Sequence, residues 1–197
     1  MWNVNQSPQV RDVAMPVFFT VSDFSEGSLQ SFAKALHKAH DASQPLVPLF
    51  IQSDGGRADI LFGMMSLMES YRKKGMQFAG VVSGTAASAG CCLFLFCDFR
   101  YMGEFSSLMF HSSQVFLNNN LPVVMSMIDF IKTEDERMNE VLETHLKKKK
   151  GWFKAQMKKN GVDDWLISAR SAHSMGLATS ISIPEFNLTI RSEFSIS

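Results

Sequence analysis

The sequence predicts an α/β fold with a mostly parallel, buried sheet. Short apolar runs alternate with stretches of helical periodicity, and this strand-helix unit occurs three times in the N-terminal half of the chain. Such alternation is typical of parallel sheets that are covered by helices. The chain has 197 residues, of which 46% are hydrophobic, and this favours one domain built around one sizeable core.

The first two units have clear boundaries. Residues 17–21 (VFFTV) read as a buried strand, and Ser28 is the expected N-cap of the helix that follows. Residues 47–52 (VPLFIQ) form the second expected strand, which ends at the turn 53–56 (SDGG). Apolar residues recur at helical spacing in the two helices: Leu29, Phe32 and Leu36, then Ile60, Met64, Leu67 and Tyr71.

The third unit leads into the rest of the chain. Residues 78–82 are a strand, and residues 84–88 form a turn into an apolar helix. Two short strands fit residues 99–102 and 108–110, and a long helix follows over about 122–146. The uncharged stretch 76–97 is long enough to span a bilayer, but its glycines and serines better suit a strand, a turn and a helix start.

Charge and cysteine content exclude several classes of partner. Nineteen basic residues balance nineteen acidic ones, so neither nucleic acid nor an anionic membrane is an expected partner. The lysine run 147–150 is expected to be a solvated helix end and not a nucleic-acid patch. The N-terminus does not resemble a secretory signal, and Cys91, Cys92 and Cys97 have neither disulfide nor zinc spacing, so we expect buried thiols in the cytoplasm.

Ser88 lies in the segment 84–90 (GTAASAG), where a buried strand is expected to end and an apolar helix to begin. A hydroxyl at a helix N-terminus lies among unpaired backbone N–H groups, which can stabilise an oxyanion that forms beside it. Taken alone, such a serine is more often an N-cap, so this segment by itself leaves both roles open.

Gly55, Gly56 and His111 are candidates for supporting such chemistry. Two glycines directly after a buried strand allow an N–H to approach a substrate carbonyl, although an ordinary turn is the alternative. His111 ends a short apolar strand, where a group with a near-neutral pKa suits a general base or a purely structural role. The other histidines fall on helix patterns and are expected to be mostly solvated: His37, His40, His145 and His173.

Two neighbouring aspartates, Asp163 and Asp164, precede a stretch that reads as helical. Either of them suits a helix cap, because Asp is favoured at that position. Composition and spacing do not choose between the two.

In chain order, five segments resemble the ClpP family, the proteolytic subunit of Clp protease. The resemblance covers about residues 17–183 and includes the strand-turn, serine and histidine segments described above. The matching segments are 51–56 (IQSDGG), 84–90 (GTAASAG), 108–111 (LMFH), 137–140 (RMNE) and 164–169 (DWLISA) with 176–181 (GLATSI).

The resemblance implies a ClpP/crotonase-like spiral of repeated strand-helix units and a serine endopeptidase that needs no cofactor and no metal. Ser88 would be the nucleophile, His111 the general base and Asp164 the group that orients His111. The backbone N–H groups of Gly56 and Ala89 would form the oxyanion hole. Further residues would contact the substrate: Gly55, Ser112, Ser113, Gln114 and Val115.

The resemblance also implies an assembly of heptameric rings, stacked in pairs into a tetradecamer around a closed chamber, that cleaves peptides and unfolded proteins. The whole chain, 1–197, would be one peptidase domain. Its head would span about 14–111 and 151–184, its protruding strand-helix handle 112–146 and its tail 185–197. The handle has an apolar face that ring-ring contact would bury: Val123, Val124, Met127, Ile128 and Ile131.

Four departures from the family pattern bear on specificity and partners. Asp54 stands where the family has proline, and Asp163 stands where it has arginine. The strand after the histidine, 112–117 (SSQVFL), has bulky side chains in place of glycines. Only about sixteen residues precede the first strand, fewer than in the family, and this makes a Clp-type ATPase partner doubtful. A shortened chain of this kind resembles the bacteriophage members of the family. Such a member would act in the host cytoplasm.

Three alternative functions remain at this point. The chain would be an inactive structural subunit of a mixed ring if its triad did not assemble. A crotonase-like acyl-CoA enzyme would share the spiral fold without needing the serine, histidine and aspartate. A relative of the signal-peptide peptidases would use a serine-lysine pair, but no membrane anchor supports it.

Overall fold

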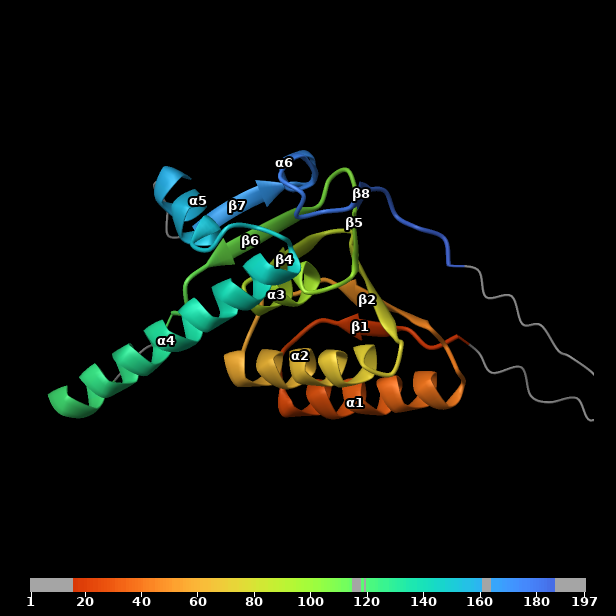
Figure 1. The fold of residues 1–197 in the computed structure, drawn as a ribbon, viewed down its shortest axis with the longest axis horizontal. Coiled ribbons are helices and arrows are strands. Elements are labelled where there is room, and N and C mark those ends of the chain that lie inside the picture. The colour runs from red at the N-terminus through yellow and green to blue at the C-terminus, as the bar shows by residue number, and fades with distance from the viewer. Residues whose placement is uncertain (1–15, 115–117, 119, 161–163, 187–197) are drawn as a thin grey trace, which may run out of the picture.

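Six helices and eight strands make up the described part of this computed structural model, which comprises residues 16–114, 118, 120–160 and 164–186 (Figure 1). The strands are β1 Phe19–Val21, β2 Leu46–Ile51, β3 Gln77–Val82, β4 Thr85–Ala87, β5 Phe99–Met102, β6 Ser107–His111, β7 Asp164–Ser168 and β8 Ser180–Ile181. The helices are α1 Glu26–Asp41, α2 Ala58–Arg72, α3 Ala89–Leu95, α4 Leu121–His145, α5 Trp152–Asn160 and α6 Ala169–Ser174.

The larger sheet is parallel throughout, and this confirms the predicted α/β class. Its five strands have the order β1-β2-β3-β5-β8. The interior of β3 is buried on both faces, as expected of a parallel strand that is covered on both sides. Helices α1 and α2 contact each other and cover one side of this sheet (Figure 1).

A second sheet of three strands, in the order β4-β6-β7, carries the segments of most interest for function. β4 runs parallel to β6, whereas β7 runs antiparallel to it, and a bridge between Ser53 and Ala86 joins this sheet to the chain that leaves β2. Two of these strands were not predicted from the sequence. β4 was predicted as a turn, because it has only three small residues, and β7 was predicted as the start of a helix.

β7 is a strand because its side chains alternate between the two faces of the sheet. Trp165 and Ile167 are buried, while Leu166 is exposed. This period of two fits a strand and not a helix. Asp164 is therefore the first residue of a strand and not a helix cap.

The uncharged stretch 76–97 forms the centre of the molecule. It contains β3, β4 and α3, and every residue of α3 is buried, including Cys91 and Cys92. Cys97 is buried as well, so the expectation of buried free thiols is confirmed. Across the described residues, every helix is too short or too polar to pass through a lipid bilayer.

Two local expectations were wrong. Ser25, not Ser28, caps α1: its hydroxyl accepts the Ser28 N–H at 3.2 Å, and the Ser28 hydroxyl accepts the Ser25 N–H at 2.9 Å. This reciprocal pair moves the start of the helix towards the N-terminus by one turn. His145 is not solvated either, because its Nε2 lies 3.1 Å from the Cys97 carbonyl oxygen and burial lowers its pKa.

The helix α4 extends away from the sheets, and only its C-terminal part is packed against them (Figure 1). Glu143, which is 2% exposed, accepts backbone N–H groups of Gly151 at 2.8 Å and of Phe153 at 3.0 Å and so fixes the start of α5. Phe153 then stacks on Phe110, with ring centroids 4.5 Å apart. These contacts hold the end of β6, and with it His111, in place.

Candidate active site

Ser88 occupies a strained turn between β4 and α3. Its backbone has φ 52° and ψ −121°, a conformation that residues other than glycine rarely adopt and that costs about 1–3 kcal/mol. Its N–H donates to the Met109 carbonyl at 2.8 Å, which ties the turn to β6. The Ser88 hydroxyl makes no hydrogen bond that caps α3, although capping is the usual role of a serine at the start of a helix.

Gly55 and Gly56 lie against this turn. Both have positive φ angles, 105° and 149°, which are accessible to glycine at little cost. A Cβ atom on Gly55 would come within 2.6 Å of the Ser88 Cβ, and one on Gly56 within 2.9 Å of the Phe24 Cβ. Any side chain at residue 55 would therefore displace the serine.

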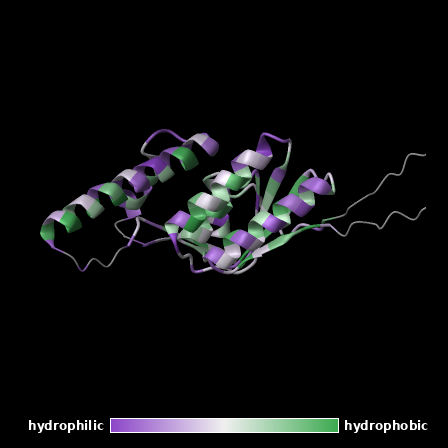
Figure 2. Ribbon diagram, turned by 90° about the horizontal axis from the view of Figure 1, so that it is seen from below, coloured by the Kyte–Doolittle hydropathy of each residue, from purple (hydrophilic) through white to green (hydrophobic). Residues whose placement is uncertain are grey.

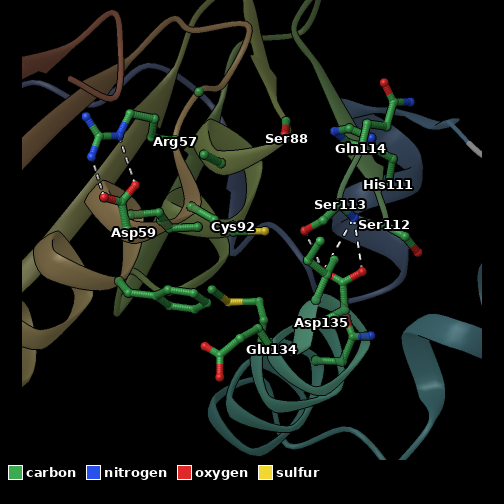
Figure 3. Close-up of a pocket in the computed structure, with 18 of the residues that line it drawn as sticks. Arg57, Asp59, Ser88, Cys92, His111, Ser112, Ser113, Gln114, Glu134 and Asp135 are labelled. Carbon is green, nitrogen blue, oxygen red and sulfur yellow. Dashed lines mark hydrogen bonds and ion pairs between the residues drawn. The ribbon is translucent and has the colours of Figure 1, made fainter. Parts of the chain in front are cut away.

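His111 ends β6 and faces Ser88 across a pocket (Figure 3). Its side chain is 12% exposed, and within the described part of the chain its buried Nδ1 has no hydrogen-bond partner. Asp164 is its cross-strand neighbour in the pairing of β6 with β7. The Asp164 Oδ1 lies 3.8 Å from Nδ1, which is too far for a hydrogen bond but within ion-pair range.

The pocket beside Ser88 has a volume of about 430 Å³. It brings together most of the residues predicted to act on a substrate: Gly56, Ser88, Ala89, His111, Ser112, Ser113 and Gln114. Gly55 and Asp164 do not line the pocket themselves; Gly55 lies against Ser88, and Asp164 lies next to His111. Val115 and Asp163 fall outside the described residues.

The walls of this pocket were not predicted from the sequence. They come from α2 and α4: in Figure 3, Asp59 of α2 lies to the left of Cys92, and Glu134 of α4 lies below it. The only available signal was the match at residues 137–140, which includes Met138 and Asn139 of the α4 wall. Apolar side chains dominate these walls: Leu61, Phe62, Phe130, Ile131 and Met138.

A carboxylate on α4 holds the segment that follows His111. Asp135 accepts the Ser113 N–H at 3.0 Å and the Ser113 hydroxyl at 2.6 Å. The position of Ser113 therefore depends on the position of α4.

Cys92 lines the pocket below Ser88, but its thiol is not poised as a nucleophile. Burial raises the pKa of Cys92 to about 12, with a smaller contribution from the charge of Asp135. A thiol with such a pKa stays protonated at neutral pH and behaves as a small apolar group. Ser88 is thus the better nucleophile candidate in this pocket.

A serine on a strained turn between a strand and a helix, beside a pocket in an α/β fold, is an arrangement found in hydrolases that use a serine nucleophile. The match to a family model is consistent with this class: the model of the Clp protease family covers residues 17–184. The chain belongs to the Clp protease family, whose members are peptidases acting on peptide substrates. A search of curated protein sequences finds no match to this chain.

Proposed function

We propose that this protein is a serine endopeptidase in which Ser88, His111 and Asp164 form a catalytic triad. The observation that carries the proposal is the placement of Ser88, in a strained turn and with no capping bond from its hydroxyl, opposite His111. The His111 Nδ1 is buried and has no hydrogen-bond partner among the described residues. Asp164 faces that nitrogen from the neighbouring strand. Membership of the Clp protease family supports peptide substrates.

The mechanism is acyl transfer. Ser88 Oγ attacks the peptide carbonyl while His111 Nε2 takes its proton, and the same proton then passes to the leaving amine. Water, deprotonated by His111, hydrolyses the acyl-enzyme, and the chemistry consumes no ATP. Gly56 and Ala89 both line the pocket, and their backbone N–H groups stabilise the oxyanion in this proposal.

Asp164 acts by orienting His111. A carboxylate that accepts a hydrogen bond from Nδ1 leaves Nε2 as the proton acceptor and stabilises the imidazolium. The present separation of 3.8 Å requires the carboxylate to move by about 1 Å to reach hydrogen-bond distance. Asp164 has room to move, because its side chain is 56% exposed.

We propose further that the chain assembles into stacked heptameric rings, with 112–146 as the handle between them and with the head, 14–111 and 151–184, in the ring. The first turns of α4 expose apolar side chains, and Figure 2 shows hydrophobic positions along the projecting helix. Burying such a face requires a partner, and a second ring would supply it. The exposed side chains are Leu121, Val123, Met125, Met127 and Phe130.

Labelling with a fluorophosphonate probe tests the proposal. We expect the probe to modify Ser88 alone, and peptide mass spectrometry locates the modified residue. The native mass of the assembly should correspond to fourteen chains, the number that the family resemblance implies. The same preparation should cleave short peptides and unfolded proteins. An unlabelled Ser88 in a fully assembled sample would instead favour an inactive structural subunit.

Gly55→Ala is expected to lower kcat/KM for peptide cleavage by about a hundredfold or more. The added methyl would lie within 2.6 Å of the Ser88 Cβ, so the nucleophile must shift, and a displacement of about 1 Å costs roughly a hundredfold in rate. Steady-state kinetics on a short fluorogenic peptide measures the loss.

Gly75→Ala provides the matched control. Gly75 has a comparable φ of 88°, but a Cβ there would meet nothing within 4 Å. Both variants carry similar backbone strain, about 1 kcal/mol, which lowers the unfolding temperature without touching the pocket. If the two variants lose activity equally, the contact between Gly55 and Ser88 has no part in catalysis.

A further inference from the structure

The apolar pocket beside Ser88 contains one carboxylate that is available to a ligand. Glu134 lines the pocket from α4, and its side chain is 24% exposed. Among the described residues its nearest cation is Arg137, whose Nη1 lies 3.7 Å from Glu134 Oε1, beyond hydrogen-bond distance. Arg137 is itself 72% exposed, so solvent screens this pair and a substrate can replace it.

The other charged groups of the pocket already have close partners. Asp135 accepts both the N–H and the hydroxyl of Ser113. Arg57 donates Nε to Asp59 at 3.0 Å and Nη2 to the same carboxylate at 2.6 Å, and it also reaches Glu26 at 3.2 Å. Three carboxylates and one guanidinium line the pocket, so the net charge of its lining is negative and the electrostatic field in the pocket favours a cation.

The shape of the pocket fits a long side chain that is apolar along its length and charged at its tip. In Figure 3, Ser88 and Glu134 lie at opposite ends of the pocket, and Cys92 lies between them. Leu61, Phe62 and Met138 line the space with apolar surface. The methylene groups of lysine or arginine pack well on such surface while the charged end reaches a carboxylate.

We propose that the enzyme cleaves peptide bonds after lysine or arginine and that Glu134 is the residue that sets this preference. The inference rests on the proposed serine peptidase function. The residue whose carbonyl is attacked places its side chain in the pocket next to the nucleophile, which is the pocket that sets specificity in serine peptidases. Glu134 would pair with the ammonium or guanidinium group of that residue.

The test uses three fluorogenic tripeptides that differ only in the residue before the scissile bond: lysine, arginine or norleucine. Norleucine has an unbranched side chain like that of lysine but carries no charge. We expect kcat/KM for the basic peptides to exceed that for the norleucine peptide by about tenfold to a hundredfold, as for one partly buried charge pair. The ratio should fall with rising salt concentration, because ions screen the pair.

Two variants at Glu134 and one control separate charge recognition from other effects. Glu134→Gln should lower the ratio of basic to norleucine cleavage to about one, and Glu134→Lys should favour a peptide with glutamate at the same position. Glu136→Gln removes the same charge from an exposed position of α4 outside the pocket and should leave the ratio unchanged. A ratio of two rates on one preparation does not depend on how much of the protein is folded or assembled.

Preference for norleucine in the unchanged protein would overturn the inference, as would a ratio unaffected by Glu134→Gln. Either result would leave the proposed peptidase function intact, because peptides would still be cleaved. Failure to cleave any of the peptides, together with an unlabelled Ser88, would instead overturn the proposed function and this inference with it.

Discussion

Replacing Ser88 with alanine is expected to lower kcat for peptide hydrolysis on the order of a millionfold, the loss known for a triad nucleophile. The hydroxyl is the group that forms the covalent intermediate, and the neighbouring Cys92 thiol cannot replace it, because burial keeps that thiol protonated. Initial rates on a short peptide and on an unfolded protein measure the effect. The alanine variant must be purified away from any active enzyme, since a trace of it would dominate the residual rate.

The fold should survive this substitution. Alanine at residue 88 keeps the strained backbone that serine already has, and the lost hydroxyl makes no capping bond. The unfolding temperature should therefore change by only about 2 °C or less, within the range for substitutions that break no buried contact. Ser83→Ala, at an exposed position outside the pocket, should change neither activity nor stability. Full turnover by the Ser88 variant would favour chemistry without a serine nucleophile, as in a crotonase-like enzyme.

Asp164→Asn is expected to lower kcat by about ten thousandfold with little effect on KM. Asparagine keeps the shape of the side chain, but its amide can donate to Nδ1 and so stabilise the wrong tautomer of the histidine, as the same change does in trypsin. The His111 imidazolium would also lose its counter-charge. Kinetics over a range of pH, with the folded fraction measured by circular dichroism, quantifies the loss.

Asp163→Asn is the matched control for this prediction. It removes the same charge from the adjacent residue, which composition and spacing alone did not distinguish from Asp164. We expect its kcat to stay within about threefold of the unchanged protein, a barrier change of less than about 1 kcal/mol, because the carboxylate proposed to orient His111 is kept. If Asp163→Asn lowered kcat and Asp164→Asn did not, residue 163 would be the orienting group. If neither variant lowered kcat, His111 would need another partner.

The fold was predictable where the pattern of apolar residues has a clear period. The buried strands β2 and β3 stand out as apolar runs, and the helices between them have one apolar face. β4 and β7 were missed, because strands of three small residues or of five alternating ones resemble turns and short helices. Their identity is set by pairing with β6, which is a contact between distant parts of the chain.

The residues of the candidate site that lie at strand ends were predictable from the sequence, but the helices that form the pocket walls were not. Ser88, His111 and the glycines stand at the ends of strands, where local sequence carries a signal. The α2 and α4 walls depend on how two helices approach each other, and helical periodicity gives the apolar face of a helix but not its neighbour. Glu134 was missed for this reason, since in the sequence it is one of three consecutive acidic residues.

The position of β7 after β6 in the chain has a consequence for biosynthesis. The strand that aligns the proposed triad is made only after residue 164 leaves the ribosome, and the α5 contacts that brace β6 are made only slightly earlier. A nascent polypeptide folds from its N-terminus, so β1, β2, β3 and β5 of the larger sheet can pair while His111 still lacks the neighbouring strand β7. On the proposed mechanism, a newly translated subunit would not cleave other proteins before β7 has been made and paired with β6.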